Sequence, residues 1–369
     1  MYENFVKQLL ELQNMLEDDI SKNIFNARIL KNYNFNCSYM QLLKNVSDKT
    51  LYVRPVESWI KCHYSYEALC NQQILSFEDK IVLFGLSEHS MNLFEVLGFE
   101  KIKNLVWCVK KPGTLSKACG KPVISYQDLI LNYRDYKFVL MESEIKDIIN
   151  IYKELVYIGF NKDKIFKLGY TNRNQYFDDS FAALNPNRTI FQIFVDLGGL
   201  DGGTSIEFAK RTNYTYKQIY IFEPDPLNYE NTLCNINNSN LKNVEIFNIG
   251  GWSKKDTLNF NISSRNTSSR ISDNGNYMVK VNSLDNVLGD TPVTFIKMDV
   301  EGAELEALIG AEKIVKKYKP HLAISLYHRP EDIFEIPLYV KKLVPEYKLY
   351  LRHYSLHYSY ETVLHAFVD

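Results

Sequence analysis

The stretch "VDLGGLDGGTS", from Val195 to Ser205, sets four glycines within six positions directly after a short apolar run. Glycine lets a backbone turn sharply and approach a neighbour or a ligand with no side chain between them. The "TSIEFAK" that follows has the pattern of a helix start, and we expect Thr204 or Ser205 to cap it. The order of strand, glycine turn and helix is typical of α/β sheets, but the turn alone fits a dinucleotide, a nucleoside or no ligand.

The apolar runs around this turn predict a seven-stranded sheet. The expected strands are Ile193–Leu197, Ile219–Phe222, Val244–Asn248, Thr294–Asp299, Leu322–Tyr327, Tyr347–Arg352 and Thr362–Phe367. Most are separated by helical patterns, which indicates parallel pairing through crossover helices. The last two are joined by "HYSLHYSY", too short for a helix, and predict an antiparallel hairpin. Ligands of such sheets bind at the carboxyl ends of the strands.

The preceding sequence predicts three further parts of the chain. Residues 1–79 look mainly helical, and apolar residues spaced from Phe5 to Ile20 predict an amphipathic helix that packs on its own protein or on a second copy. Residues 80–170 alternate short apolar runs with helices, which predicts a small α/β domain. Residues 171–189 are polar and indicate a linker, so that the domain with the glycine turn spans 190–369.

Composition excludes several classes of protein. The chain has 369 residues, 43 of them basic and 44 acidic, with a formal net charge of -1, which argues against a nucleic-acid-binding surface. No apolar run is long enough to span a membrane, and the acidic N-terminus does not resemble a signal peptide. The cysteines are scattered and indicate reduced thiols in the cytoplasm: Cys37, Cys62, Cys70, Cys108, Cys119 and Cys234. A zinc site at Cys37, Cys62, His63 and Cys70 lacks the usual spacing, which favours buried thiols.

Acidic residues near the turn indicate which nucleotide it would bind. The second strand ends in "IFEPDP", and Glu223 there is suited to accept hydrogen bonds from the two hydroxyls of a ribose. Asp196 precedes the first glycine, where a carboxylate would repel a pyrophosphate and attract a cation. The positively charged sulfur of S-adenosylmethionine fits that field better than NAD does.

Three further residues are expected at the same edge of the sheet. Asp299 ends the fourth strand, Glu301 follows it, and His328 ends the fifth. A histidine of ordinary pKa could accept the proton of an acceptor hydroxyl. The alternatives are that the two acids cap the next helix and that His328 binds a loop carbonyl. Asp299 and His328 could also hold a divalent cation, but two ligands do not establish a metal site.

Residues 190–369 resemble the FkbM-type family of S-adenosylmethionine-dependent methyltransferases. Seven stretches carry the resemblance, in family order: "VDLGGLDGGTS", "YIFEPDPLNYENTL", "IGGWSKKDTLNF", "SSRIS", "FIKMDVEGAELEALIGAE", "LAISLYHRPEDIFEIPLYV" and "YLRHYS…ETVLHA". The family fold is a seven-stranded Rossmann-like sheet with an antiparallel last strand. The resemblance implies O-methylation of a sugar, sugar nucleotide or glycan, with N-methylation as a variant. A non-catalytic module of a glycan pathway is the alternative.

The resemblance also assigns residues. The predicted cofactor residues are Asp196, Gly198, Gly199, Gly202, Thr204, Ser205, Glu223, Pro224, Asp225 and Asp299, and the predicted catalytic residues are His328, Asp299 and Glu301. Leu200 and Asp201 depart from the residues that many members carry, which puts one polar cofactor contact in doubt. The 80–170 domain resembles small Rossmann-like domains attached to sugar-modifying enzymes. Ser87 and Ser90 replace fingerprint glycines there, so we expect no NAD site and instead a role in binding an acceptor or partner or in forming a homo-oligomer.

Overall fold

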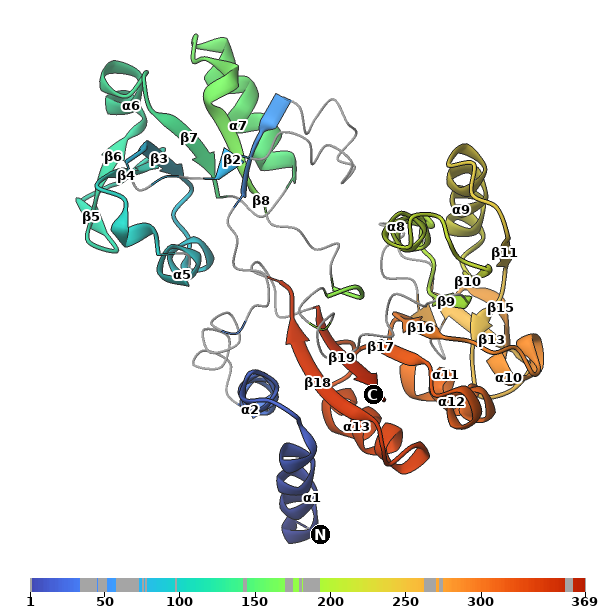
Figure 1. The fold of residues 1–369 in the computed structure, drawn as a ribbon. Helices are drawn as coiled ribbons and strands as arrows, with labels where there is room; N and C mark the ends of the chain where they lie inside the picture. The colour runs from blue at the N-terminus through green and yellow to red at the C-terminus, as the bar shows by residue number, and fades with distance from the viewer. Residues whose placement is uncertain are drawn as a thin grey trace. The chain divides into compact units, whose positions relative to one another are not determined.

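The chain forms two compact units in a computed structural model (Figure 1). The large unit comprises Met1–Asn45, Arg173–Ser355 and Ser359–Asp369, and the small unit comprises Val46–Asn172 with Leu356–Tyr358. The structure describes residues 2–33, 45, 52–57, 73–74, 76, 78–96, 98–141, 145–169, 175–178, 181, 193–261, 270–271, 275–355 and 361–368.

A seven-stranded sheet lies at the centre of the large unit. Its strands, in spatial order, are β11 (Val244–Phe247), β10 (Gln218–Phe222), β9 (Ile193–Leu197), β16 (Phe295–Met298), β17 (His321–Ser325), β19 (Thr362–Phe367) and β18 (Lys348–His353). The first five pair in parallel, whereas β19 pairs antiparallel with both β17 and β18. The predicted sheet, its antiparallel last strand and the final hairpin are confirmed.

Helices cover both faces of this sheet, so its strands are mostly apolar. Phe194 of β9 faces the core that includes α8 (Gly203–Arg211) and α9 (Pro226–Asn238), and its neighbour Val195 faces the opposite core. The second core includes α10 (Leu284–Leu288), α11 (Glu304–Ile309), α12 (Glu312–Tyr318) and α13 (Asp332–Leu343). Figure 1 shows α8 and α9 on one side of the sheet and α11 and α12 on the other. Because apolar residues fill both faces, polar groups gather where the strands end.

A four-stranded sheet beside the main one is absent from the sequence prediction. It has the order β12 (Gly250–Gly251), β15 (Tyr277–Asn282), β13 (Asp256–Asn261) and β14 (Arg270–Ile271). Phe260, Val279 and Val281 form its buried face. Its strands are short and expose their other face, and so give only a weak apolar pattern.

The N-terminal helices belong to the large unit. They are α1 (Tyr2–Met15) and α2 (Asp19–Tyr33), and Leu12 and Phe25 from them lie in the main core. The single helix predicted from Phe5 to Ile20 is therefore interrupted, and Ile20 is 46 % exposed. The break occurs where the Glu17 amide donates to the Leu349 carbonyl of β18, which a continuous helix would not allow. The N-terminal helix was predicted to pack on its own protein or on a second copy. In the structure it packs on its own protein.

The small unit contains a second α/β sheet, as predicted. Its strands run β2 (Gln73–Ile74), β1 (Tyr52–Pro55), β8 (Ile165–Gly169), β7 (Lys137–Leu140), β3 (Lys80–Phe84), β4 (Asn104–Val109), β6 (Lys121–Ser125) and β5 (Lys117–Ala118). The strands from β8 to β6 pair in parallel and those at both ends antiparallel. In the described part of this unit lie the helices α5 (Glu88–Val96), α6 (Tyr126–Asn132) and α7 (Ile145–Tyr157), with short η2 (Phe99–Lys101) and η3 (Lys162–Lys164).

Two predicted segments differ from the structure in part. β1 and β2 lie inside the 1–79 segment that was expected to be helical, because Tyr52–Pro55 pairs antiparallel with the edge strand β8. Within the 171–189 stretch read as a linker, Gln175–Asp178 and Phe181 are buried in the large unit. Cys37, Cys62, His63 and Cys70, for which buried thiols were favoured over a zinc site, lie outside the described residues. No helix among the described residues is long and apolar enough to cross a membrane.

Candidate active site

The glycine turn packs closely against its own protein. Gly198 has φ of 81°, and a Cβ there would lie 1.9 Å from the Asp299 carbonyl oxygen; a Cβ on Gly199 would lie 2.3 Å from Ile221 Cγ2. Gly202, with φ of 79°, begins α8 as its left-handed N-cap, without a side-chain cap. The expected cap from Thr204 or Ser205 is wrong, because both residues lie inside the helix. Contacts within the fold thus require these glycines, whether or not a ligand binds.

Asp196 is paired inside the protein. It is fully buried, with Lys297 Nζ 3.0 Å from its Oδ1 and the Ser205 hydroxyl donating to its Oδ2 at 2.8 Å. Burial alone would lower the pKa of Lys297, but Asp196 and Asp299 raise it above its ordinary value. Lys297 also donates to the carbonyls of Leu197 and Gly198, which fixes the turn from below. The sequence analysis expected the negative charge of Asp196 to face a cationic ligand. In the structure, Lys297 balances that charge instead.

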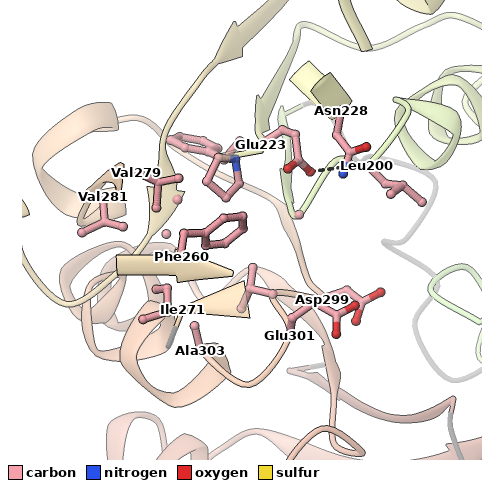
Figure 2. A pocket seen from close by; sticks show the side chains of 16 residues that line it. Leu200, Glu223, Asn228, Phe260, Ile271, Val279, Val281, Asp299, Glu301 and Ala303 are labelled. Carbon is pink, nitrogen blue, oxygen red and sulfur yellow. Dashed lines mark hydrogen bonds between the residues drawn. The ribbon is translucent and has the colours of Figure 1, made fainter. Parts of the chain in front are cut away.

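A cavity opens at the carboxyl ends of β9, β10 and β16. Among the predicted residues, Gly198, Glu223, Pro224, Asp299 and Glu301 line it. The rest of its wall comes mainly from the four-stranded sheet and the turns beside it: Leu200, Phe222, Asn228, Gly250, Gly251, Phe260, Ile271, Val279, Val281, Val300 and Ala303. Figure 2 shows Val279 and Val281 at one side of the cavity and Asp299 at the other, with Glu223 between them on the upper wall. The cavity thus joins an apolar region to carboxylates.

Glu223 is a buried carboxyl at the edge of the cavity. Its Oε2 accepts from the Leu200 amide at 2.8 Å and its Oε1 from the Asp225 amide at 2.9 Å. Burial raises the pKa of Glu223 to about 7, although these two hydrogen bonds act in the opposite direction. Each carboxylate oxygen has two lone-pair sites, so both can still accept a ligand hydroxyl. Asp225 instead caps α9, accepting from the Leu227 amide at 2.9 Å.

Asp299 lies at the opposite side of the cavity and is held by two tyrosines. The Tyr176 hydroxyl donates to Oδ2 at 2.8 Å and the Tyr327 hydroxyl to Oδ1 at 3.1 Å. Burial alone would raise the pKa of Asp299, but Lys297, His328 and the hydrogen bonds bring it below its ordinary value. Asp299 is therefore ionised at neutral pH.

His328 lies among three carboxylates. Its Nδ1 is 2.8 Å from Glu304 Oε1, while its Nε2 is 3.4 Å from Glu301 Oε2 and 3.6 Å from Asp299 Oδ1. Burial alone would lower the pKa of His328, but Glu304, Asp299 and Glu301 raise it to about 9. The imidazole therefore carries a proton at neutral pH and must lose it before acting as the predicted base. Asp299, Glu304 and His328 are close enough to hold a metal ion.

Sequence reasoning missed five residues around this cluster: Tyr176, Lys297, Glu304, Tyr327 and Glu361. Lys297 interrupts an otherwise apolar strand, and this irregularity is a usable signal. Glu304 is fully buried and accepts from the amides of Val300 and Gly302, so it holds the turn after β16. Burial and the nearby Asp299 raise the pKa of Glu361 to about 7, against a hydrogen bond from Gln175. Tyr176 comes from the stretch read as a linker, so its role required the structure.

A comparison with known proteins matches one stretch of the large unit to a family model. Residues 196–355 match the family model described as "Methyltransferase FkbM domain". This stretch holds the glycine turn, Glu223, Asp299 and His328, and it lies within the large unit. No curated protein matches the chain.

Three solved structures resemble the chain at low sequence identity. Methyltransferase FkbM from Methylobacillus flagellatus KT is 16 % identical, with a TM-score of 0.43 over 95 % of this chain and 99 % of that chain. An O-methyltransferase from Bacillus cereus in complex with SAH is 11 % identical, with a TM-score of 0.35 over 62 % and 91 %. A SAM-dependent methyltransferase from Aquifex aeolicus is 14 % identical, with a TM-score of 0.31 over 62 % and 100 %.

Proposed function

We propose that the large unit is an S-adenosylmethionine-dependent methyltransferase that methylates a hydroxyl of a sugar, sugar nucleotide or glycan. The observation that carries this proposal is the Glu223 carboxyl, placed at the end of β10 in a cavity that also borders Gly198 and Asp299. A nucleoside with a positively charged tail matches this wall: a carboxylate for the ribose, apolar surface for the adenine, and anionic side chains beyond.

Different residues of the chain bind different parts of S-adenosylmethionine. Glu223 accepts hydrogen bonds from the ribose hydroxyls, while Pro224 and the apolar residues near Val279 contact the base. Gly198 presents its backbone to the methionine part, and Lys297, Asp196 and Ser205 hold that turn rigid. When bound, S-adenosylmethionine supplies an electrophilic methyl group.

The acceptor is expected beside Asp299, Glu301 and His328. Carboxylates and tyrosine hydroxyls in one place suit a polyhydroxylated acceptor, because they accept from and donate to its hydroxyls. Holding acceptor and methyl group in line contributes most of the acceleration, about 7–11 kcal/mol for well-oriented groups. Removal of the hydroxyl proton takes place in this cluster, with His328 as the predicted acceptor of that proton once it has lost its own.

Calorimetric titration with S-adenosylhomocysteine tests the proposal without knowledge of the acceptor. The wild-type protein should bind it with micromolar affinity. Glu223→Gln should weaken binding about 100-fold or more, because hydrogen bonds to a charged group contribute roughly 1.5–3 kcal/mol each. Glu245→Gln, at an exposed acid of β11, is the matched control and should bind normally. Failure of the wild type to bind would favour a non-catalytic module.

A further inference from the structure

The two ring nitrogens of His328 have different surroundings. Nδ1 makes a close contact of 2.8 Å with Glu304, a carboxyl that is itself fixed by two backbone amides. Among the described residues, Nε2 has no hydrogen-bond partner, although the side chain is only 10 % exposed. A gap of 3.4 Å separates it from Glu301 Oε2, and one of 3.6 Å separates it from Asp299 Oδ1. A buried polar atom without a partner is costly, so this gap requires an explanation.

The distances across the gap are long for hydrogen bonds. Charge-assisted N–H···O bonds measure about 2.7–2.9 Å, whereas Nε2 lies 3.4 Å from Glu301 and 3.6 Å from Asp299. Metal bonds of about 2.0–2.2 Å at angles of roughly 90–110° separate neighbouring ligands by about 3.0–3.6 Å. These two distances from Nε2 match ligands that share one ion better than an imidazolium bound to two acids, and the three groups that lie within 4.8 Å of one another here are Asp299, Glu304 and His328.

The surrounding charge also favours a cation. Asp299, Glu301 and Glu304 are three carboxyls around one imidazole, and Lys297, the nearby lysine, is already paired with Asp196. Metal-binding histidines commonly donate their second N–H to a carboxylate, which orients the ring. Glu304 stands in that position. The Tyr176 and Tyr327 hydroxyls hold Asp299 in the same way.

We propose that Asp299 and His328 Nε2, joined by Glu301 at 3.4 Å from Nε2, bind one divalent transition-metal ion, Mn²⁺ or Zn²⁺, with Glu304, the third member of the group that lies within 4.8 Å, as the positioning residue. One imidazole and two carboxylates suit these ions, since imidazole favours zinc and similar metals and carboxylates favour manganese. A set of three protein ligands leaves further positions for water or an oxygen of the acceptor.

The catalytic role of the ion rests on the proposed function. A hydroxyl bound to the metal has a lowered pKa and loses its proton more readily. The oxygen lone pair then forms the bond to the methyl carbon, the carbon–sulfur bond pair stays with sulfur, and the proton leaves to water or to Glu361. In this arrangement His328 serves as a ligand, and the metal makes its predicted action as a base unnecessary.

Titration with MnCl₂, followed by electron paramagnetic resonance of free Mn²⁺ in the absence of cofactor, tests the site. The wild-type chain should bind one Mn²⁺, and ZnCl₂ should displace it. His328→Ala and Glu301→Gln should each weaken binding at least about tenfold, and Glu304→Gln about 10–100-fold through loss of ring orientation. Nitrogen coupling to bound Mn²⁺ should disappear in His328→Ala. Glu245→Gln should match the wild type.

Circular dichroism establishes that each variant is folded, and Glu301→Gln changes a partly exposed turn residue that the core does not need. The inference is overturned if neither Mn²⁺ nor Zn²⁺ binds up to about 1 mM, the weak end of protein cation sites. Unchanged affinity in both His328→Ala and Glu301→Gln would also overturn it. Binding of S-adenosylhomocysteine is measured separately, with Glu223→Gln as its variant. Failure of the metal test therefore does not imply failure of the cofactor test, and the reverse also holds.

Discussion

Single residues decide what this cavity can bind, and Glu223 is the clearest example. Burial raises the pKa of its carboxyl to about 7, so it is partly protonated near neutrality, whereas a ribose diol requires the ionised form as acceptor. For Asp196, in contrast, the interpretation from the sequence was wrong. Its position before the turn suggested a free charge facing a ligand, but the pairing with Lys297 depends on contacts between neighbouring strands.

Cofactor affinity should therefore rise with pH. The ionised fraction of a group with pKa about 7 grows about tenfold between pH 6 and pH 8, so the dissociation constant of S-adenosylhomocysteine should fall about tenfold over that range. The ligand binds the ionised form of Glu223 and so lowers the pKa of this carboxyl. The affinity therefore increases as the pH rises. Calorimetry at several pH values measures this slope, and Glu223→Gln should remove it. A wild-type affinity independent of pH would show that Glu223 does not receive the ribose.

At the scale of elements, the main sheet was predictable because its strands are buried on both faces. All seven expected strands occur, with ends shifted by at most two residues. The four-stranded sheet was not predictable, because its strands are short and half exposed. The linker interpretation also missed Tyr176, since a few buried side chains in a polar stretch leave no periodic signal.

The turn between β9 and α8 provides a prediction at this scale. Gly198 and Gly202 share a left-handed φ, at 81° and 79°, but a Cβ at Gly198 meets a backbone carbonyl at 1.9 Å, whereas at Gly202 it meets side-chain carbons at 3.3 Å. Gly202→Ala should cost roughly 1–2 kcal/mol of unfolding free energy, from backbone conformation. Gly198→Ala should cost more, about 3 kcal/mol or above, because β9 and β16 must separate. Urea unfolding compares the two, and equal losses would contradict the packing role of Gly198.

On the scale of the whole molecule, the N-terminal helices are part of the large unit. Arg352 of β18, with a side chain 7 % exposed, lies 2.6 Å from Asp18 and also donates to the Ser21 hydroxyl. Sequence reasoning placed 1–79 apart from 190–369, because nothing local reveals a contact between residues more than 330 positions apart. The boundaries of the predicted domains stay a prediction, but the site's sheet is covered by helices from both ends of the chain.

Breaking this contact should destabilise the large unit. Arg352→Ala should lower the unfolding free energy by about 1–3 kcal/mol, less than for a fully buried pair because Asp18 is 32 % exposed. Glu346→Gln, which removes an exposed pair with Lys319, should change stability little. Thermal unfolding of both variants checks this expectation. An Arg352 variant as stable as the wild type would mean that the helices are held by apolar contacts alone.

The central claim is that the Glu223 carboxyl receives the ribose of S-adenosylmethionine in the cavity beside the glycine turn. A crystal structure with S-adenosylhomocysteine tests it directly. We predict both ribose hydroxyls within hydrogen-bond distance of Glu223 and the sulfur on the side of Asp299. A ligand bound elsewhere, or a ribose facing away from Glu223, would contradict the account.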